Sequence, residues 1–182
     1  MEAIYIYVIP IWIYAVVEMF FKLRYKTSPA EKRMDPTYFA VTIPALSILF
    51  VPIIFSITSK RQPSETTILL YLIIFFAGIS IRYLGLKEIR GLFSVKVELR
   101  NNHHVIDTGI YKHIRHPLYL GTIIMALSAI VYYVNISSII LMVLLLVGTA
   151  LRIRKEETHL QNNLTGYSDY MKKTKRLLPY LF

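Results

Sequence analysis

The chain has 182 residues, of which 55% are hydrophobic, 13% aromatic and only 18% charged, and its mean hydropathy is +0.49. About a quarter of the residues of a soluble domain are charged, so this composition excludes an ordinary water-soluble globule. The absence of cysteine excludes disulfides, a thiolate metal site and a cysteine nucleophile. A net charge of +10 could suit nucleic acid, but such binding needs a basic face on a soluble domain, so we expect no nucleic-acid partner.

Four apolar blocks follow one another along the chain. Ala3–Leu23, Thr37–Thr58 and Thr67–Leu86 each have the length at which a helix crosses a hydrocarbon layer of roughly 30 Å. The last block, Leu118–Leu151, is too long for one span and is interrupted near Asn135, which favours a hairpin of two spans. The sequence therefore predicts an all-α integral membrane protein with five transmembrane helices, including a C-terminal helical hairpin.

The positions of the basic residues predict the orientation. Lys and Arg concentrate on the cytoplasmic side of a membrane protein. With the N-terminus outside, all of the 21 basic residues except Lys60 and Arg61 lie on or next to the cytoplasmic face. We therefore expect a multi-pass protein with its N-terminus outside and its C-terminus in the cytoplasm, in contact with membrane lipids and without an obligate protein partner.

Two ionisable residues fall inside the spans. Glu18 lies in the first span and Arg82 in the third, and such residues often indicate function. Both lie near the expected cytoplasmic ends of their helices. We interpret them as side chains that reach the membrane surface or, for Glu18, as one that pairs with Lys22.

Residues 87–116 hold the first polar segment that could carry chemistry. Pro117 suits the first turn of the fourth span because it lacks an N–H group, which helices leave unbonded at that position. Arg115 and His116 would then lie at the membrane surface, beside a helix N-terminus that attracts anions. The alternative is ordinary anchoring at the membrane interface by Arg, His and Tyr.

The second polar segment begins at the end of the fifth span. If the helix continues beyond Leu151, Arg152 and Glu156 lie one turn apart on the same face and can pair. The alternative is a solvated pair without function. We interpret the run Lys172-Lys-Thr-Lys-Arg176 as a binding surface for lipid headgroups.

Taken together, these motifs resemble a known family. The string Gly109-Ile-Tyr-x-x-Ile-Arg-His-Pro-x-Tyr-x-Gly121 is followed by Arg152-x-x-x-Glu-Glu157 and by Gly-Tyr-x-x-Tyr170, and His103 precedes it. This combination resembles the isoprenylcysteine carboxyl methyltransferase family of integral-membrane enzymes, which use S-adenosylmethionine and release S-adenosylhomocysteine. The resemblance divides the chain into three N-terminal transmembrane helices, residues 1–86, and a methyltransferase core, residues 87–182, that contains the hairpin 118–151.

The resemblance also implies a cytoplasmic cofactor pocket and its residues. The residues expected to bind the cofactor are His103, Val105, Gly109, Tyr111, His116, Pro117, Tyr119, Glu156 and Glu157. Catalytic roles fall to Arg115, Arg152 and Glu156. No metal is expected, because methyl transfer from a sulfonium mainly requires alignment of the reacting atoms and exclusion of water.

We therefore expect a membrane O-methyltransferase that acts on a lipophilic or amphiphilic acceptor. The carboxylate of a prenylated cysteine is the acceptor that the family resemblance suggests. One alternative is a membrane-embedded, NADPH-dependent reductase of the sterol-reductase type. The lack of a Gly-x-Gly-x-x-Gly motif does not exclude it, since such reductases do not need one. A non-enzymatic membrane scaffold is the third alternative.

Overall fold

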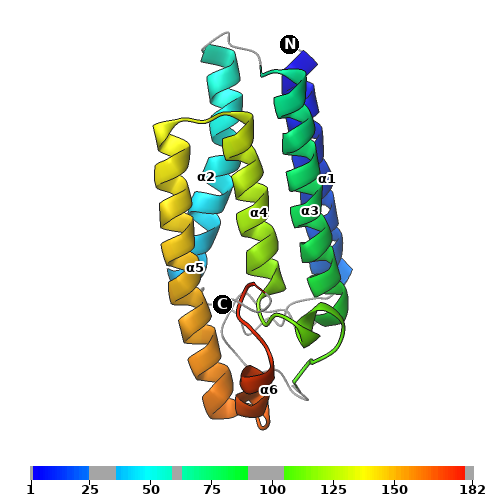
Figure 1. The fold of residues 1–182 in the computed structure, drawn as a ribbon, viewed down its shortest axis with the longest axis vertical. Helices are drawn as coiled ribbons and strands as arrows, with labels where there is room; N and C mark the ends of the chain where they lie inside the picture. Colours follow the sequence, from blue (N-terminus) through cyan, green and yellow to red (C-terminus); the bar gives the residue numbers. More distant parts are fainter. Residues whose placement is uncertain (1, 25–35, 59–62, 90–104, 179–182) are drawn as a thin grey trace.

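The computed structural model describes residues 2–24, 36–58, 63–89 and 105–178. Within these ranges the chain is all-helical, which confirms the predicted class. Five long helices lie side by side and run alternately in opposite directions (Figure 1). They are α1 (Glu2–Arg24), α2 (Pro36–Thr58), α3 (Glu65–Ile89), α4 (Pro117–Tyr132) and α5 (Ile136–Asn163). A short 3-10 helix, η1 (Gly109–Lys112), precedes α4, and α6 (Tyr167–Lys173) follows α5.

The helical hairpin formed by α4 and α5 is confirmed. The break falls at Asn135, whose side chain accepts a hydrogen bond of 2.9 Å from the backbone N–H of Ser138 and caps α5. Pro117 occupies the first turn of α4, as predicted. Helix α5 has 28 residues, or about 42 Å at 1.5 Å per residue, so it is longer than its apolar part, which ends at Leu151. Its last three turns are polar and carry charged side chains beyond that part.

Three of the helices, α2, α3 and α5, are long and apolar enough to cross a membrane. Shorter apolar stretches, Tyr5–Phe20 and Pro117–Tyr132, lie in α1 and α4. Large hydrophobic side chains such as Trp12, Ile43 and Val134 point outward and are exposed, as expected for surfaces that face lipid. The count of five transmembrane spans remains a prediction, because only three helices in the described residues are both long and apolar enough to cross a membrane.

Helix α4 lies between two groups of helices. Figure 1 shows α1 and α3 on one flank of α4 and α2 and α5 on the other. The α3–α4 contact is close because glycines face each other across it. A Cβ atom on Gly121 would lie 2.7 Å from the carbonyl oxygen of Gly78, and one on Gly78 would lie 2.8 Å from that of Gly121. Small residues of this kind let helix backbones approach each other inside a membrane.

A cluster of buried tyrosines joins α1, α3 and α4 at the end of the bundle away from α6. The rings of Tyr7 and Tyr71 stack with centroids 4.8 Å apart, and Tyr132 packs 4.6 Å from Tyr7. Their hydroxyls do not lack partners: Tyr7 donates to the carbonyl of Leu49, and Tyr71 donates to the carbonyl of Tyr7. These tyrosines fix the position of α1 at that end.

The interpretation of Glu18 and Arg82 as surface-reaching groups is wrong. The two side chains pair with each other across α1 and α3, with Arg82 Nη2 2.7 Å from Glu18 Oε1. Their side chains are only 13% and 12% exposed. The prediction failed because the facing of two apolar helices cannot be derived from the spacing within either one. The predicted partner Lys22 has a side chain outside the described part of the structure.

Candidate active site

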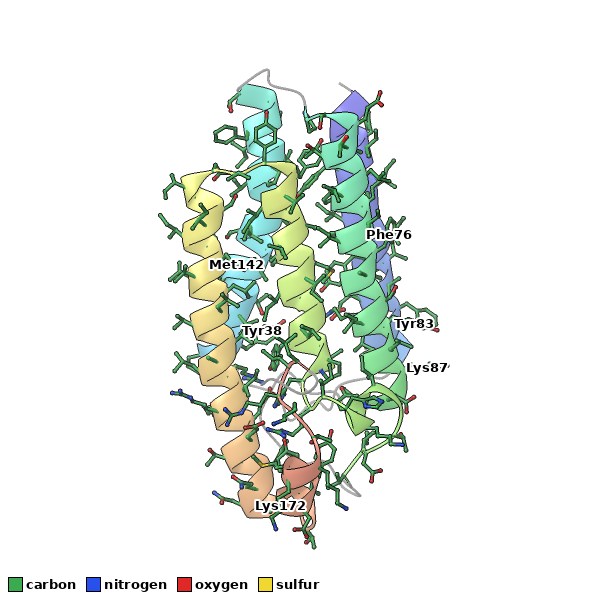
Figure 2. All side chains as sticks on the ribbon, in the orientation of Figure 1. Tyr38, Phe76, Tyr83, Lys87, Met142 and Lys172 are labelled. Atoms are coloured by element: carbon green, nitrogen blue, oxygen red, sulfur yellow. The ribbon has the colours of Figure 1, made fainter. Side chains whose placement is uncertain are left out.

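The predicted site residues converge at one end of the bundle, here called the polar end. It consists of η1, the N-terminus of α4, the last three turns of α5, α6 and residues 174–178. Figure 2 shows Lys87 and Lys172 at this end, whereas Phe76 and Met142 lie along the apolar middle. The two polar segments predicted from the sequence therefore meet, as expected.

The segment before α4 is held by the chain that follows α6. Ile114 forms a parallel β-bridge with Lys175. The backbone N–H of Arg115 donates to the carbonyl of Lys175 at 2.8 Å, and that of His116 donates to the carbonyl of Arg176 at 3.0 Å. These backbone bonds fix the direction in which the Arg115 and His116 side chains leave the chain.

The carboxylate of Glu157 gathers three basic side chains. Its Oε1 accepts a hydrogen bond of 2.8 Å from Arg115 Nε and lies 3.2 Å from His116 Nε2. Its Oε2 accepts from Arg176 Nε at 2.9 Å. The bond to Glu157 favours the imidazole tautomer with its proton on Nε2. Because the carboxylate is only 4% exposed and both oxygens are engaged, Glu157 holds the polar segments together.

Arg115 also ties α6 to this cluster. Its Nη1 donates to the backbone carbonyls of Met171, at 3.1 Å, and Thr174. The hydroxyl of Tyr170 donates to the carbonyl of Tyr111 at 2.7 Å, so η1 is anchored to α6 as well. Arg115 therefore binds the Glu157 carboxylate through Nε and backbone carbonyls at the end of α6 through Nη1.

The carboxylate of Glu156 lies in a second cluster, one residue earlier on α5. Its Oε1 accepts hydrogen bonds of 2.7 Å from the Tyr119 hydroxyl and 2.8 Å from Arg152 Nε. Its Oε2 lies 3.8 Å from His116 Nδ1, beyond ordinary hydrogen-bond distance, and the side chain is 20% exposed. The Glu156 side chain is therefore partly exposed, whereas that of Glu157 is enclosed.

Arg152 is the most deeply buried member of the Glu156 cluster, with 2% exposure. Its Nε also lies 3.2 Å from the Tyr119 hydroxyl, and its Nη1 donates to Thr37 Oγ1 at 3.1 Å. The predicted pairing of Arg152 with Glu156 is confirmed, with Arg152 buried and Glu156 partly exposed. The residue before it, Leu151, is the last of the exposed apolar side chains along α5. Arg152 therefore marks the boundary between the apolar and polar parts of the helix.

The environment sets the protonation of several groups. Burial by itself raises the pKa of Glu157, but the hydrogen bonds from His116 and Arg115 outweigh it and lower the pKa to about 2. Burial raises the pKa of Tyr170 to about 12, and burial with Tyr170 nearby raises that of Tyr111 well above its ordinary value. At neutral pH the carboxylate is therefore charged and both phenols keep their protons.

The structure brings together six of the predicted site residues, Arg115, His116, Tyr119, Arg152, Glu156 and Glu157. Tyr111 lies on η1, where its carbonyl accepts the hydrogen bond from Tyr170. Gly109, with φ +54°, packs against the end of α3, where a Cβ would lie 2.5 Å from Glu88 Oε1. Pro117 is buried against Gly85 of α3. Val105 is half-buried, and His103 lies outside the described residues.

Sequence reasoning missed Thr37 and the contact that Arg176 makes with Glu157. Thr37 had no motif that could have indicated it, since it meets Arg152 across 115 positions of sequence. Arg176 belongs to the run interpreted as a lipid-headgroup surface, whereas its Nε binds Glu157. The available sequence signal was that Arg176 follows Tyr167 and Tyr170 by a few residues. That spacing does not indicate which residue Arg176 contacts. Among the described residues, no three His, Asp or Glu side chains are placed to hold a metal ion.

Comparison with known families decides between the alternatives left open by the sequence. A model of the isoprenylcysteine carboxyl methyltransferase family matches residues 69–162, just over half of the 182 residues. The chain belongs to this family. No curated protein matches the chain. The family assignment confirms the resemblance found in the motifs and makes the chain a membrane methyltransferase.

The part matched by the isoprenylcysteine carboxyl methyltransferase family covers most of α3, η1, α4 and nearly all of α5. It includes both glutamates and all four of their partners on α4 and α5 or just before α4. Helices α1, α2 and α6 lie outside it, although α2 supplies Thr37 and the chain after α6 supplies Arg176. The site of this family member is therefore completed by segments beyond the matched region.

Proposed function

We propose that this protein transfers the methyl group of S-adenosylmethionine to a lipophilic or amphiphilic acceptor. One observation carries the proposal: the family's Arg-His-Pro-x-Tyr and Glu-Glu motifs meet in space, where the apolar part of α5 ends. A site at that level can receive a water-soluble cofactor from one side and a membrane-dissolved acceptor from the other. The carboxylate of a prenylated cysteine fits this acceptor class.

The residues on α4 and α5 fit the chemical groups of the cofactor. S-adenosylmethionine, when bound, supplies a methyl group on a positively charged sulfur. Glu156 is partly exposed, and its Oε2 can accept hydrogen bonds from an amino group or from ribose hydroxyls. The rings of His116 and Tyr119, 5.8 Å apart, can face a cation. We also assign Tyr111, Val105, Gly109, Pro117 and His103 to the surroundings of this pocket.

The arginines have different roles in this proposal. Arg152 lies at the depth where the polar head of an acceptor would meet the cofactor, and we assign it to the acceptor. A guanidinium suits a carboxylate because it offers parallel N–H donors. Arg115 and Glu157 position the site, since they bind each other and the chain around α6. Burial of the reacting groups keeps water from competing for the methyl group.

The proposal is tested by methyl transfer with labelled S-adenosylmethionine. Purified protein is incubated with lipid extract, and labelled products are identified by mass. We expect label in a lipophilic product, together with binding of S-adenosylhomocysteine and none of NADPH. A heat-denatured sample controls for non-enzymatic transfer. NADPH binding without S-adenosylhomocysteine binding would instead support the membrane reductase.

We further propose five transmembrane spans with the N-terminus outside and the polar end in the cytoplasm. The alternating directions of α1 to α5 and the lysines at the polar end support this arrangement. A reporter fused after Phe182 is expected to be active in the cytoplasm, and one fused before Met1 is expected outside. Both reporters on one side would contradict an odd number of spans. A reporter after Thr58, where the arrangement predicts the outside, serves as an internal check.

A further inference from the structure

The partly buried ion pair between Glu18 and Arg82 lies next to the site without contacting its carboxylates. Arg82 binds Glu18 with two nitrogens, Nε at 3.1 Å from Oε2 and Nη2 at 2.7 Å from Oε1. Tyr14 lies beside the pair, with its ring centroid 5.7 Å from the guanidinium carbon. A planar ion pair joined by two hydrogen bonds fixes the relative orientation of the two side chains as well as the distance between them.

The third nitrogen of the Arg82 guanidinium binds the beginning of α4. Its Nη1 donates to the carbonyl of Leu118 at 3.0 Å and to Thr122 Oγ1 at 2.9 Å. Leu118 and Thr122 are one turn apart, and Tyr119 lies between them in sequence. The backbones are close here as well, since a Cβ on Gly121 would lie 3.0 Å from Arg82 Cβ. Arg82 therefore binds the turn of α4 that carries Tyr119.

Glu18 keeps the guanidinium in this orientation. The groups that Arg82 binds on α4 are neutral, so the carboxylate of Glu18 supplies the charge that balances it in the apolar interior. Glu18 lies on α1, outside the region matched by the family, whereas Arg82 lies inside it. An accessory helix thus contributes to the geometry of the family core.

We propose that Glu18 and Arg82 are positioning residues, which hold the first turn of α4 so that Tyr119 and His116 meet Glu156. The inference rests on the proposed function, because it assigns the pair to the alignment of that site. Tyr119 reaches Glu156 at 2.7 Å and Arg152 at 3.2 Å, and a small shift of the turn would lengthen both contacts. Displacements of about 1 Å can cost roughly 100-fold in rate.

The kinetic test uses Glu18→Gln, Arg82→Gln and the double variant in detergent-purified protein. We expect each single variant to lower kcat by roughly tenfold, with the acceptor KM and the affinity for S-adenosylhomocysteine changed less than about threefold. The double variant is expected to be no slower than the slower single variant, because both changes break one interaction. Lys87→Gln removes an exposed cation from the same helix and is the matched control, with unchanged kcat.

A second readout does not depend on activity. Amide hydrogen exchange of residues 118–122 is expected to be about tenfold faster in Glu18→Gln than in the wild type, with exchange around Tyr71 unchanged. If Arg82→Gln does not fold, Arg82→Lys replaces it. Because lysine keeps the charge, this variant should retain part of the wild-type kcat. Wild-type kcat and wild-type exchange in Glu18→Gln would overturn the inference, as would independent, additive effects of the two changes.

The two proposals can fail separately. If the wild type transfers no methyl group to any acceptor but the exchange of residues 118–122 rises in Glu18→Gln, the proposed function is wrong and the positioning role stands. If the wild type transfers methyl groups and both single variants match it in kcat and exchange, the positioning role is wrong and the function stands.

Discussion

Arg152→Ala is expected to lower turnover by about 100-fold while changing the affinity for S-adenosylhomocysteine less than about threefold. Arg152 is 2% exposed and binds Glu156, Tyr119 and Thr37 through the contacts described above. In the proposed role Arg152 aligns the acceptor, and a group with that role contributes mainly in the transition state. Its loss therefore reduces kcat more than it reduces ground-state binding of the cofactor.

Arg152→Lys tests whether the shape of the guanidinium matters as well as its charge. Lysine keeps the positive charge but cannot bind Glu156 and Thr37 through separate nitrogens of one rigid plane. We expect this variant to lose about tenfold in turnover. Arg154→Ala is the matched control, since Arg154 is exposed on the same helix two residues away. Near-normal turnover in both Arg152 variants would remove Arg152 from the mechanism, and lost cofactor affinity would place it in the cofactor pocket.

Glu157→Gln is expected to lower the free energy of unfolding by about 3 kcal/mol, since it leaves the buried Arg115 and the partly exposed Arg176 without their shared anion. The side chain is 4% exposed and binds Arg115, His116 and Arg176. The amide keeps one acceptor oxygen but turns an NH2 group toward a basic neighbour. Thermal unfolding in detergent measures the loss. Asp169→Asn breaks an exposed pair with Lys172 on α6 and should leave the unfolding temperature unchanged, whereas equal effects of the two variants would contradict the role of Glu157.

The same carboxylate gives this expectation a pH dependence. Its ordinary pKa is near 4.5 and is lowered to about 2 in the folded protein. A lowered pKa means that the carboxylate stabilises the fold fully above pH 4.5 and loses that contribution as the pH falls toward 2. The stability difference between wild type and Glu157→Gln should therefore shrink below pH 4.5.

Much of the fold was predictable because it depends on local properties of the chain. Apolar blocks of membrane-spanning length correspond to α1, α2 and α3 within a few residues, and the hairpin break falls at Asn135. Local spacing was equally reliable for the site. Arg152 and Glu156 pair because residues four apart share a helix face, and Pro117 starts α4 because it lacks an N–H.

The contacts that failed prediction all join separate elements. A helix that is apolar on every side has no amphipathic pattern to show which face meets which neighbour. The pair Glu18–Arg82 and the contact between Thr37 and Arg152 depend on that facing. Arg176 was interpreted from its basic neighbours, whereas its contact with Glu157 follows from the β-bridge that aligns residues after α6 with the segment before α4.

The adjacency of Glu156 and Glu157 has a consequence for how α5 can move. Successive side chains on a helix point about 100° apart, so the two carboxylates face different partners. Rolling α5 about its axis by one residue would turn Glu157 toward Tyr119 and carry Glu156 out of reach, breaking both clusters at once. Midway along the helix, Gly148 lies so close to α2 that a Cβ there would collide with the carbonyl oxygen of Ala40. Rotation of α5 at this contact would carry the side chains that flank Gly148 into the backbone of α2, so the packing fixes the rotational setting of α5 and with it the direction in which each carboxylate faces.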